Sequence, residues 1–351
     1  MTADGTAHES AGTASGRRRL QALMARGAAF LGSEHAILCG AMTWVSERNL
    51  VAAISNAGGF GVLACGAMEP DRLDEEIRAT RALTDRSFAV NLITMHPALD
   101  RLVELCCAHG LTHVVLAGGI PPGWAIDRLK SAGIRVLCFA PAYALARKLI
   151  RAGVDALIIE GSEAGGHIGP VSTSVLAQEI LPRVTEVPVF VAGGIGRGAA
   201  VAAYLEMGAA GVQLGTRFVC ATESIAHPAF KKAFIRAPAR DAVASVQFDP
   251  RFPVIPVRGL RNEGTKRFIA AQRDLIAKVD RGEMDQKTAA LEIEHFWAGA
   301  LRRAVVEGDV ETGSIMAGQS VGLVEREQPA AEIIRDMLDE ATAYLTVRDA
   351  S

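Results

Sequence analysis

The sequence has almost no net charge and no long apolar run. Its 37 Lys and Arg residues nearly balance 39 Asp and Glu residues, which leaves a formal net charge of −2. A balanced surface provides no field that would attract nucleic acid or an anionic membrane, and no run approaches the ~20 apolar residues of a membrane span. We therefore expect no nucleic-acid or membrane partner, and a small-molecule or protein-borne substrate.

Metal-ligand spacing and two common catalytic motifs are also missing. The six cysteines mostly lie in apolar runs, without the regular Cys and His spacing of metal sites. The sequence contains no H-E-x-x-H and no G-x-x-x-x-G-K-[ST], which argues against zincin and P-loop chemistry. Buried free thiols fit a reducing compartment, so we expect a cytoplasmic protein without a metal.

Short apolar runs alternate with amphipathic stretches from residue 36 onward. The stretch 70–83, for example, carries Leu73, Ile77 and Leu83 at spacings that predict one helical face. Apolar strands that alternate with helices indicate a parallel sheet. The eight runs begin near residues 36, 60, 88, 112, 134, 156, 187 and 211. A repeat of ~25 residues predicts an α/β fold of the closed (β/α)₈ type, with a doubly wound sheet plus a second domain as the alternative.

Composition divides the chain into four parts. Residues 1–16 are small and polar, which predicts a disordered leader, and residues 17–216 contain the predicted barrel. Residues 217–300 begin with a segment rich in proline and arginine and continue as helices, so we expect a cap over the active face. Residues 301–351 are expected to return to the barrel.

Glycines follow the last two predicted strands. Gly193 and Gly194 follow the seventh strand, and Gly215 precedes Thr216 after the eighth. In a (β/α)₈ barrel these two loops commonly bind phosphate through backbone N–H groups. A dinucleotide fingerprint is one alternative, although the acidic residue expected ~20 positions later is absent, since Glu206 comes too early. Tight turns without a ligand are the other.

Small and amide residues end the first and third predicted strands. Gly40, Ala41 and Met42 follow the first strand, and Asn91 lies near the end of the third. An amide can donate to and accept from a planar heterocycle, and a small backbone lets such a ring lie flat. The alternative for Asn91 is a hydrogen bond to its local backbone.

His167 is the sharpest candidate for catalysis. It follows the sixth predicted strand among Gly165, Gly166 and Gly169, where an imidazole could serve as a general base close to a ligand. The alternative is a histidine that only binds substrate or hydrogen-bonds its own loop. Two flanking carboxylates could tune it or remain solvated, and a second histidine is a lesser candidate; these are Glu160, Glu163 and His227.

Several segments together resemble one known family. They are "CGAMTWVSERNLVAAISNAGGFGVL", "RSFAVNLI", "EGSEAGGHIG", "VFVAGGIGRG", "GVQLGTRFVCATESIAHPAFK" and "GDVETGSIMAGQSVGLV". Over about residues 35–345 the chain is similar to the nitronate monooxygenase (2-nitropropane dioxygenase) family, which includes the FMN-dependent enoyl-acyl-carrier-protein reductase II enzymes.

The resemblance implies an FMN site and a catalytic histidine. It places the FMN phosphate at Gly193, Gly194, Gly215 and Thr216, the ring at Gly40, Ala41, Met42 and Asn91, with Gly166 and Gln213 also in the cofactor site, and catalysis at His167. The first expectation is oxidation of alkyl nitronates by O₂ to carbonyl compounds and nitrite. The alternatives are an NAD(P)H-dependent reductase of an acyl thioester and a flavin-binding module without turnover, and the partners expected include a second copy in a homodimer.

Some segments depart from the family pattern or favour one branch. The first strand ends in "CGAM", where glutamine and paired glycine are commoner, and "AGGIPPGW" and "FAPAYALARK" differ where the substrate pocket is expected. The forms "GGHIG" and "GSIMAGQ" are closer to the reductase branch.

Overall fold

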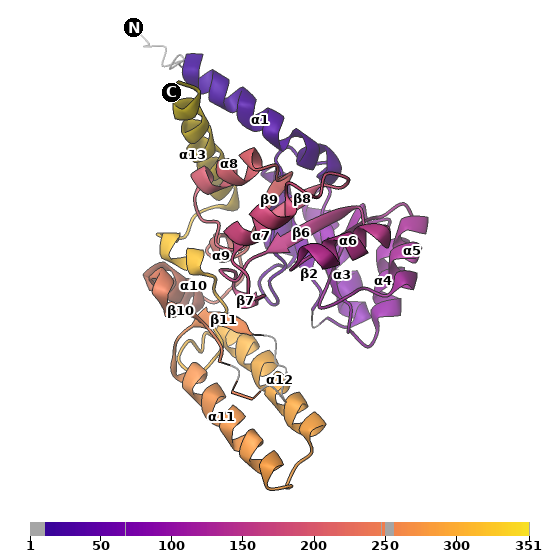
Figure 1. The fold of residues 1–351 in the computed structure, drawn as a ribbon, viewed down its shortest axis with the longest axis vertical. Helices are drawn as coiled ribbons and strands as arrows, with labels where there is room; N and C mark the ends of the chain where they lie inside the picture. Colours follow the sequence, from indigo (N-terminus) through magenta and orange to yellow (C-terminus); the bar gives the residue numbers. More distant parts are fainter. Residues whose placement is uncertain (1–10, 67, 247, 250–255, 351) are drawn as a thin grey trace.

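Eight parallel strands form a closed barrel (Figure 1). The computed structural model describes residues 11–66, 68–246, 248–249 and 256–350. The strands are β1 (Ile37–Cys39), β2 (Val62–Ala64), β3 (Ala89–Ile93), β4 (His113–Ala117), β5 (Arg135–Phe139), β6 (Ala156–Glu160), β8 (Val189–Ala192) and β9 (Gly211–Leu214). They pair in the order β1-β9-β8-β6-β5-β4-β3-β2, and a parallel bridge between Leu38 and Phe60 closes the ring. The predicted (β/α)₈ fold is confirmed, and the doubly wound sheet is wrong.

Helices follow the strands and cover the outside of the barrel. They are α2 (Arg48–Asn56), α3 (Pro70–Leu83), α4 (Leu99–Ala108), α5 (Gly123–Ser131), α6 (Tyr143–Arg151), α7 (Thr173–Ile180), α8 (Gly198–Glu206) and the short α9 (Thr216–Val219). In α3, Leu73 and Ile77 are buried as predicted, but Leu83 is 47 % exposed because it ends the helix beyond the buried face. No helix in the described ranges is both long and apolar enough to cross a membrane.

Aromatic rings fill the amino-terminal end of the barrel. The Phe30 ring of α1 (Ala11–Leu31) lies 5.3 Å from the ring of His113 on β4 and 6.1 Å from that of Phe190 on β8. The ring of Phe60 also lies edge-on to that of His113, with the ring centres 5.0 Å apart. These contacts connect strands across the barrel, so they mark the inner face of the sheet and leave the carboxyl end as the open one.

The first and last helices pack together, as Figure 1 shows. Residues 11–16, predicted to belong to a disordered leader, instead begin α1, and residues 1–10 lie outside the described residues. Gly16 allows this contact, because a Cβ there would lie 2.3 Å from Thr346 Oγ1 of α13 (Ala330–Ala350). The leader prediction fails here because a distant helix supplies packing that the local sequence does not reveal.

The segment between α9 and α13, which includes most of the predicted cap at 217–300, lies outside the eight barrel strands and is called the cap below. Its elements are α10 (Pro228–Arg236), η1 (Ala239–Asp241), β10 (Ala242–Ala244), β11 (Val257–Leu260), α11 (Glu263–Asp280), α12 (Gln286–Arg302), η2 (Arg303–Glu307) and η3 (Gln319–Leu323). β10 and β11 form a three-stranded antiparallel sheet with β7 (Gly166–His167), a short strand within the loop that follows β6. α11 and α12 extend away from the barrel as a hairpin (Figure 1) with a small core of their own.

Candidate active site

Three polar side chains share the inner face of the barrel near its open end. Residues paired across parallel strands point to the same face of a sheet. Glu160 on β6 pairs with Ala192, and Ala192 pairs with Gln213 on β9. Pairing from Asn91 through β4 and β5 to β6 places Asn91 on that face too. The open end of the barrel therefore carries two amides and one carboxyl.

None of these three side chains hydrogen-bonds another group in the part of the chain that the structure describes. Asn91 is 6 % exposed and Gln213 is 7 % exposed, and within the described ranges neither amide nor the Glu160 carboxyl makes a side-chain hydrogen bond. Their polar atoms keep some access to water, because the fully buried side-chain nitrogen and oxygen atoms without a partner in the described ranges belong to Arg217. Accessible amide and carboxyl groups that are not engaged by the protein can hydrogen-bond a ligand with a polar edge.

The Glu160 carboxyl is shifted towards its neutral form. Burial raises the pKa of Glu160 to about 8, because a carboxylate loses hydration inside the narrow opening. Part of the residue surface remains exposed, so a ligand can reach it. At pH 7 most of the population is therefore protonated and able to donate a hydrogen bond.

Four of the predicted cofactor residues meet where β1 and β9 end. A Cβ on Gly40 would lie 3.4 Å from Gly215 Cα and 3.7 Å from Gln213 Nε2, and one on Gly215 would lie 3.8 Å from Met42 Sδ. Ser46 fixes the loop, since its hydroxyl donates to Gly40 O at 2.8 Å and accepts from Met42 N at 3.0 Å. Only small residues leave this backbone open to a ligand.

The turn after β8 needs glycine for conformational reasons. Gly193 and Gly194 have φ angles of 92° and 72°, which side chains other than glycine rarely adopt. A Cβ on Gly193 would also lie 3.0 Å from Thr173 Oγ1. Packing alone accounts for the glycine at 193, so phosphate binding by these N–H groups rests on the other evidence for a cofactor.

The helix end that a dinucleotide-binding site would need for its phosphates, the start of α8, is already occupied. The Gly198 N–H at the start of α8 donates to Glu340 Oε2 of α13 at 2.7 Å, so a carboxylate already fills that helix terminus. Gly196 lies against the Leu323 side chain, 2.7 Å from where its Cβ would be. These contacts leave no room for a pyrophosphate at the start of α8.

His167 lies on a strand of the cap sheet, where the sequence indicates only a loop. It pairs with Val257 on β11, and the next residue, Ile168, donates its N–H to Pro256 O at 2.9 Å. The side chain is exposed and has no hydrogen-bond partner among the described residues. The backbone is thus held by the cap while the imidazole stays free for a ligand.

The segment 313–319 forms a wall beside His167. A Cβ on Gly165 would lie 2.6 Å from Gly318 N, and one on Gly166, whose φ is 77°, would lie 3.7 Å from Met316 Sδ. The Gly318 N–H also donates to Thr216 Oγ1 at 3.0 Å. The wall therefore joins the histidine loop to the loop after β9.

Two residues near the predicted site have structural roles. Glu163 accepts hydrogen bonds from Thr173 N at 2.8 Å and Thr173 Oγ1 at 3.0 Å, so it caps α7. It is therefore committed to that helix and is not free to tune His167. His227 caps α10 in the same way, because its Nδ1 accepts from Ala229 N at 3.1 Å.

The letters G-x-S-x-G occur at residues 318–322, but without the geometry of a nucleophile. Ser320 lies in the 3₁₀ turn η3 and is 6 % exposed. A nucleophile elbow requires a strand, a sharp turn and a helix. The segment instead covers Gly196, where Ser320 Cβ would lie 3.3 Å from an added Cβ.

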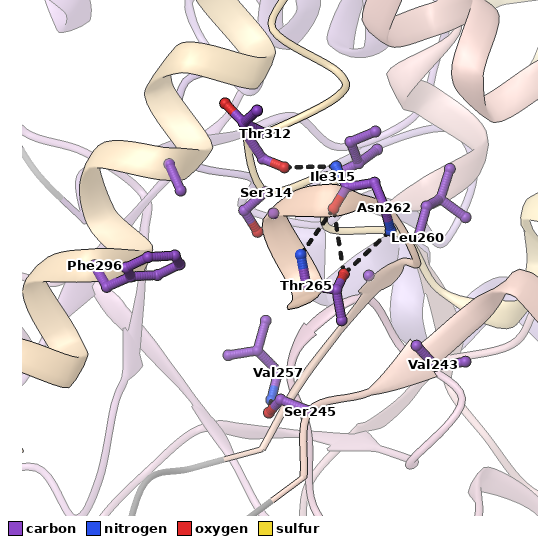
Figure 2. A pocket seen from close by; sticks show the side chains of 14 residues that line it. Val243, Ser245, Val257, Leu260, Asn262, Thr265, Phe296, Thr312, Ser314 and Ile315 are labelled. Carbon is purple, nitrogen blue, oxygen red and sulfur yellow. Dashed lines mark hydrogen bonds between the residues drawn. The ribbon is translucent and has the colours of Figure 1, made fainter. Parts of the chain in front are cut away.

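Two cavities lie elsewhere. Figure 2 shows one in the cap, of about 20 Å³, where Asn262 Nδ2 donates to Gly313 O at 2.8 Å and Asn262 Oδ1 accepts from Thr265 N at 3.0 Å. These bonds fix the start of α11, and the space holds about one water molecule. The other, of about 330 Å³, lies at the closed end beside His113 and Arg135.

In the sequence, Glu160 is only one of two carboxylates that flank the glycine loop. The residues that share the inner face of the barrel with it cannot be identified from the sequence. Glu160 and Ile158 lie two residues apart, so the sequence alone places their side chains on the same face of β6. Which face of each strand points into the barrel follows only from the register of the strands. The wall 313–319 had a sequence signal in "GSIMAGQ", although its position beside His167 did not follow from that signal.

Comparisons with known proteins agree over most of the chain. The family model described as nitronate monooxygenase matches residues 25–102 and 98–340. A Mycobacterium tuberculosis protein named (3aS,4S,5R,7aS)-5-hydroxy-7a-methyl-1-oxo-octahydro-1H-indene-4-carboxyl-CoA dehydrogenase is 32% identical over 91% of this chain and 96% of its own length. A nitronate monooxygenase from Paraburkholderia phytofirmans is 30% identical over 88% and 92%.

A solved structure shows the same fold at higher identity. FabK from Thermotoga maritima superposes with a TM-score of 0.82 and 38% sequence identity, covering 93% of this chain and 97% of that one.

Proposed function

The chain belongs to the nitronate monooxygenase family, and we propose that it is an FMN-dependent oxidoreductase that reduces an α,β-unsaturated acyl thioester with NADH or NADPH. Its relatives are oxidoreductases, so the enzyme class follows from the family. The observation that carries the cofactor is the pair of amides of Asn91 and Gln213, which lie at the open end of the barrel and make no side-chain hydrogen bond among the described residues.

The residues at the open end fit a flavin. A planar ring with polar atoms along its edge matches the amides of Asn91 and Gln213 and the small backbone at Gly40 and Gly215. The phosphate would bind the backbone N–H groups of the loop that contains Gly194. When bound, FMN supplies hydride transfer, which amino-acid side chains cannot perform.

The protein's own residues would orient and protonate the substrate. Reduction of a C=C bond beside a thioester adds a hydride at Cβ and a proton at Cα. The free imidazole of His167 is the group we assign to the proton, because it is exposed and held by its backbone. Asn91 and Gln213 fix the position of the ring.

The thioester assignment rests on the wall beside His167. The wall "GSIMAGQ" and the histidine loop "GGHIG" are the two segments closer in form to the reductase branch, and they touch at Gly165 and Gly318. The similarity to FabK from Thermotoga maritima and to an enzyme whose name ends in carboxyl-CoA dehydrogenase supports the same substrate class.

Nitronate oxidation is the second candidate, and it was the first expectation from sequence. It is supported by the relative named nitronate monooxygenase and by the free imidazole of His167, which can accept a proton from a carbon acid. Nothing in the wall 313–319 favours this smaller substrate over a thioester.

Anaerobic mixing separates these functions. Protein reconstituted with FMN is mixed with NADH, with NADPH, or with propyl nitronate, and the flavin absorbance is followed. We expect bleaching by a pyridine nucleotide and recovery of the absorbance on adding crotonyl thioester. Bleaching by nitronate alone, with nitrite formed when O₂ is admitted, would support the second candidate instead. Bound FMN with no bleaching by any of the three would indicate a module without turnover.

A further inference from the structure

We propose that Glu160 is a positioning residue of the cofactor site that carries a proton and enters the complex as a neutral hydrogen-bond donor. This inference rests on the proposed FMN site. It assigns a specific protonation state to one side chain, so binding of the cofactor becomes linked to proton uptake.

The position of Glu160 provides the geometric basis. It ends β6 on the inner face, in register with Ala192, and Ala192 is in register with Gln213. Because Ala192 is small, no long side chain separates Glu160 from the Gln213 strand. A ring that contacts the Gln213 amide would therefore cover the Glu160 carboxyl as well.

Among the described residues, no charged side chain pairs with the Glu160 carboxyl. The neighbouring strands end in Phe139 and Ala192. The titratable groups on adjoining loops and on β11 are Glu163, His167 and Arg258. Glu163 is held by Thr173 N and Oγ1, and the Arg258 guanidinium donates to Ser162 O at 2.8 Å and to Ala242 O at 2.6 Å.

Burial is the cause of the shift in this carboxyl. It raises the pKa of Glu160 to about 8 in the free protein, and no ion pair within the described ranges opposes it. A planar ligand that covers the carboxyl removes further water, and a buried ion without a partner is costly. Binding should therefore raise the pKa further and favour the protonated form.

The sign and size of the effect follow from linkage. With a pKa of about 8 in the free protein, about nine-tenths of Glu160 is neutral at pH 7 and about one-tenth at pH 9. If only the neutral form binds, the Kd for FMN rises about tenfold between these pH values. The FMN phosphate does not contribute, because its second pKa of about 6 lies below this range.

The experiment titrates apo-protein with FMN at pH 7, 8 and 9 and compares the wild type with Glu160→Gln. Glutamine keeps a hydrogen-bond donor and cannot ionise, so the Kd of this variant should change less than twofold. The control is Glu104→Gln, which removes an exposed carboxylate paired with Arg128 and should keep the tenfold rise. Urea unfolding of each apo-protein checks that the variants fold.

A second measurement uses the wild type alone, in case the variant does not fold. Calorimetric titration at pH 8 in buffers with different ionisation enthalpies should show uptake of about half a proton per FMN bound. No uptake, a flat wild-type Kd, or an unchanged pH dependence in Glu160→Gln would each overturn the role of Glu160. If FMN binds but these results go against Glu160, the proposed FMN site still stands. If none of the three proteins binds FMN, both the FMN site and the role of Glu160 are overturned.

Discussion

Replacing Gln213 by methionine should stabilise the free protein and weaken the cofactor complex. The substitution roughly conserves volume and removes only the amide, so packing changes little. In the free protein the residue is 7 % exposed and its amide has no hydrogen-bond partner within the described ranges. The Gln213 amide therefore destabilises the free protein slightly and stabilises the FMN complex. This pair of opposite effects distinguishes a binding role from a structural one.

The magnitudes follow from the burial of the amide. The Gln213 amide atoms keep access to water, so they cost less than the about 1–3 kcal/mol of a fully buried unpaired polar group, and we expect a gain of at most about 1 kcal/mol in the free energy of unfolding of the apo-protein. Loss of hydrogen bonds to the ring, about 1.4 kcal/mol, corresponds to about a tenfold increase in the Kd for FMN.

Urea unfolding of the apo-protein and a titration with FMN measure the two quantities. Gln328→Met is the matched control, because this amide is 3 % exposed and fully engaged. It accepts from Arg217 Nη2 and donates to Asp336 Oδ2, both at 2.8 Å. Its loss should destabilise the protein by about 3 kcal/mol and leave the Kd for FMN unchanged.

One result would refute the reasoning. If Gln213→Met destabilised the apo-protein as Gln328→Met does, the Gln213 amide would be part of an internal network and would not be held for a ligand. An unchanged Kd for FMN would lead to the same conclusion.

Three further predictions concern catalysis, packing and pH. His167→Ala should retain FMN and lower turnover by ~10²–10⁴-fold, measured by steady-state kinetics; near-normal rates would remove His167 from the proton-transfer step. Gly198→Ala should destabilise the protein by about 3 kcal/mol, because the added Cβ would lie 2.1 Å from Met337 O of α13. Urea unfolding measures this loss, and an unchanged midpoint would show that α8 and α13 can move apart at no cost. Burial lowers the pKa of His113 to about 4, below the unfolded value of about 6.5. Its neutral form therefore contributes stability above pH 6.5 that is lost as the pH falls towards 4, about 3 kcal/mol in all. The His113→Gln variant should lose less stability over that interval, and equal losses in both proteins would assign the acid sensitivity to other groups.

The barrel was predictable because its strands have a simple pattern. Parallel strands buried on both faces appear as continuous apolar runs, as in "HVVLA" of β4. Glycine after such runs marks the carboxyl ends, where barrel enzymes place their active sites. The meeting of Gly40, Met42 and Gly215 needed no information beyond the order of the strands.

Features that depend on distant partners were not predictable. β7 has two residues, Gly166 and His167, and is a strand only because β11 pairs with it. Likewise, residues 11–16 have no strong helical preference, and their helix is stabilised by contacts with α13. The neutral state of Glu160 also needed the structure, since burial causes it.

The central claim is that the open end of the barrel binds FMN between Asn91 and Gln213. Calorimetric titration of FMN into the apo-protein at pH 7, for the wild type and for the Asn91→Leu/Gln213→Met double variant, tests it most directly. We predict one FMN per chain in the wild type and affinity at least about tenfold weaker in the variant. No binding to the wild type, or equal affinity in the two proteins, would contradict the claim.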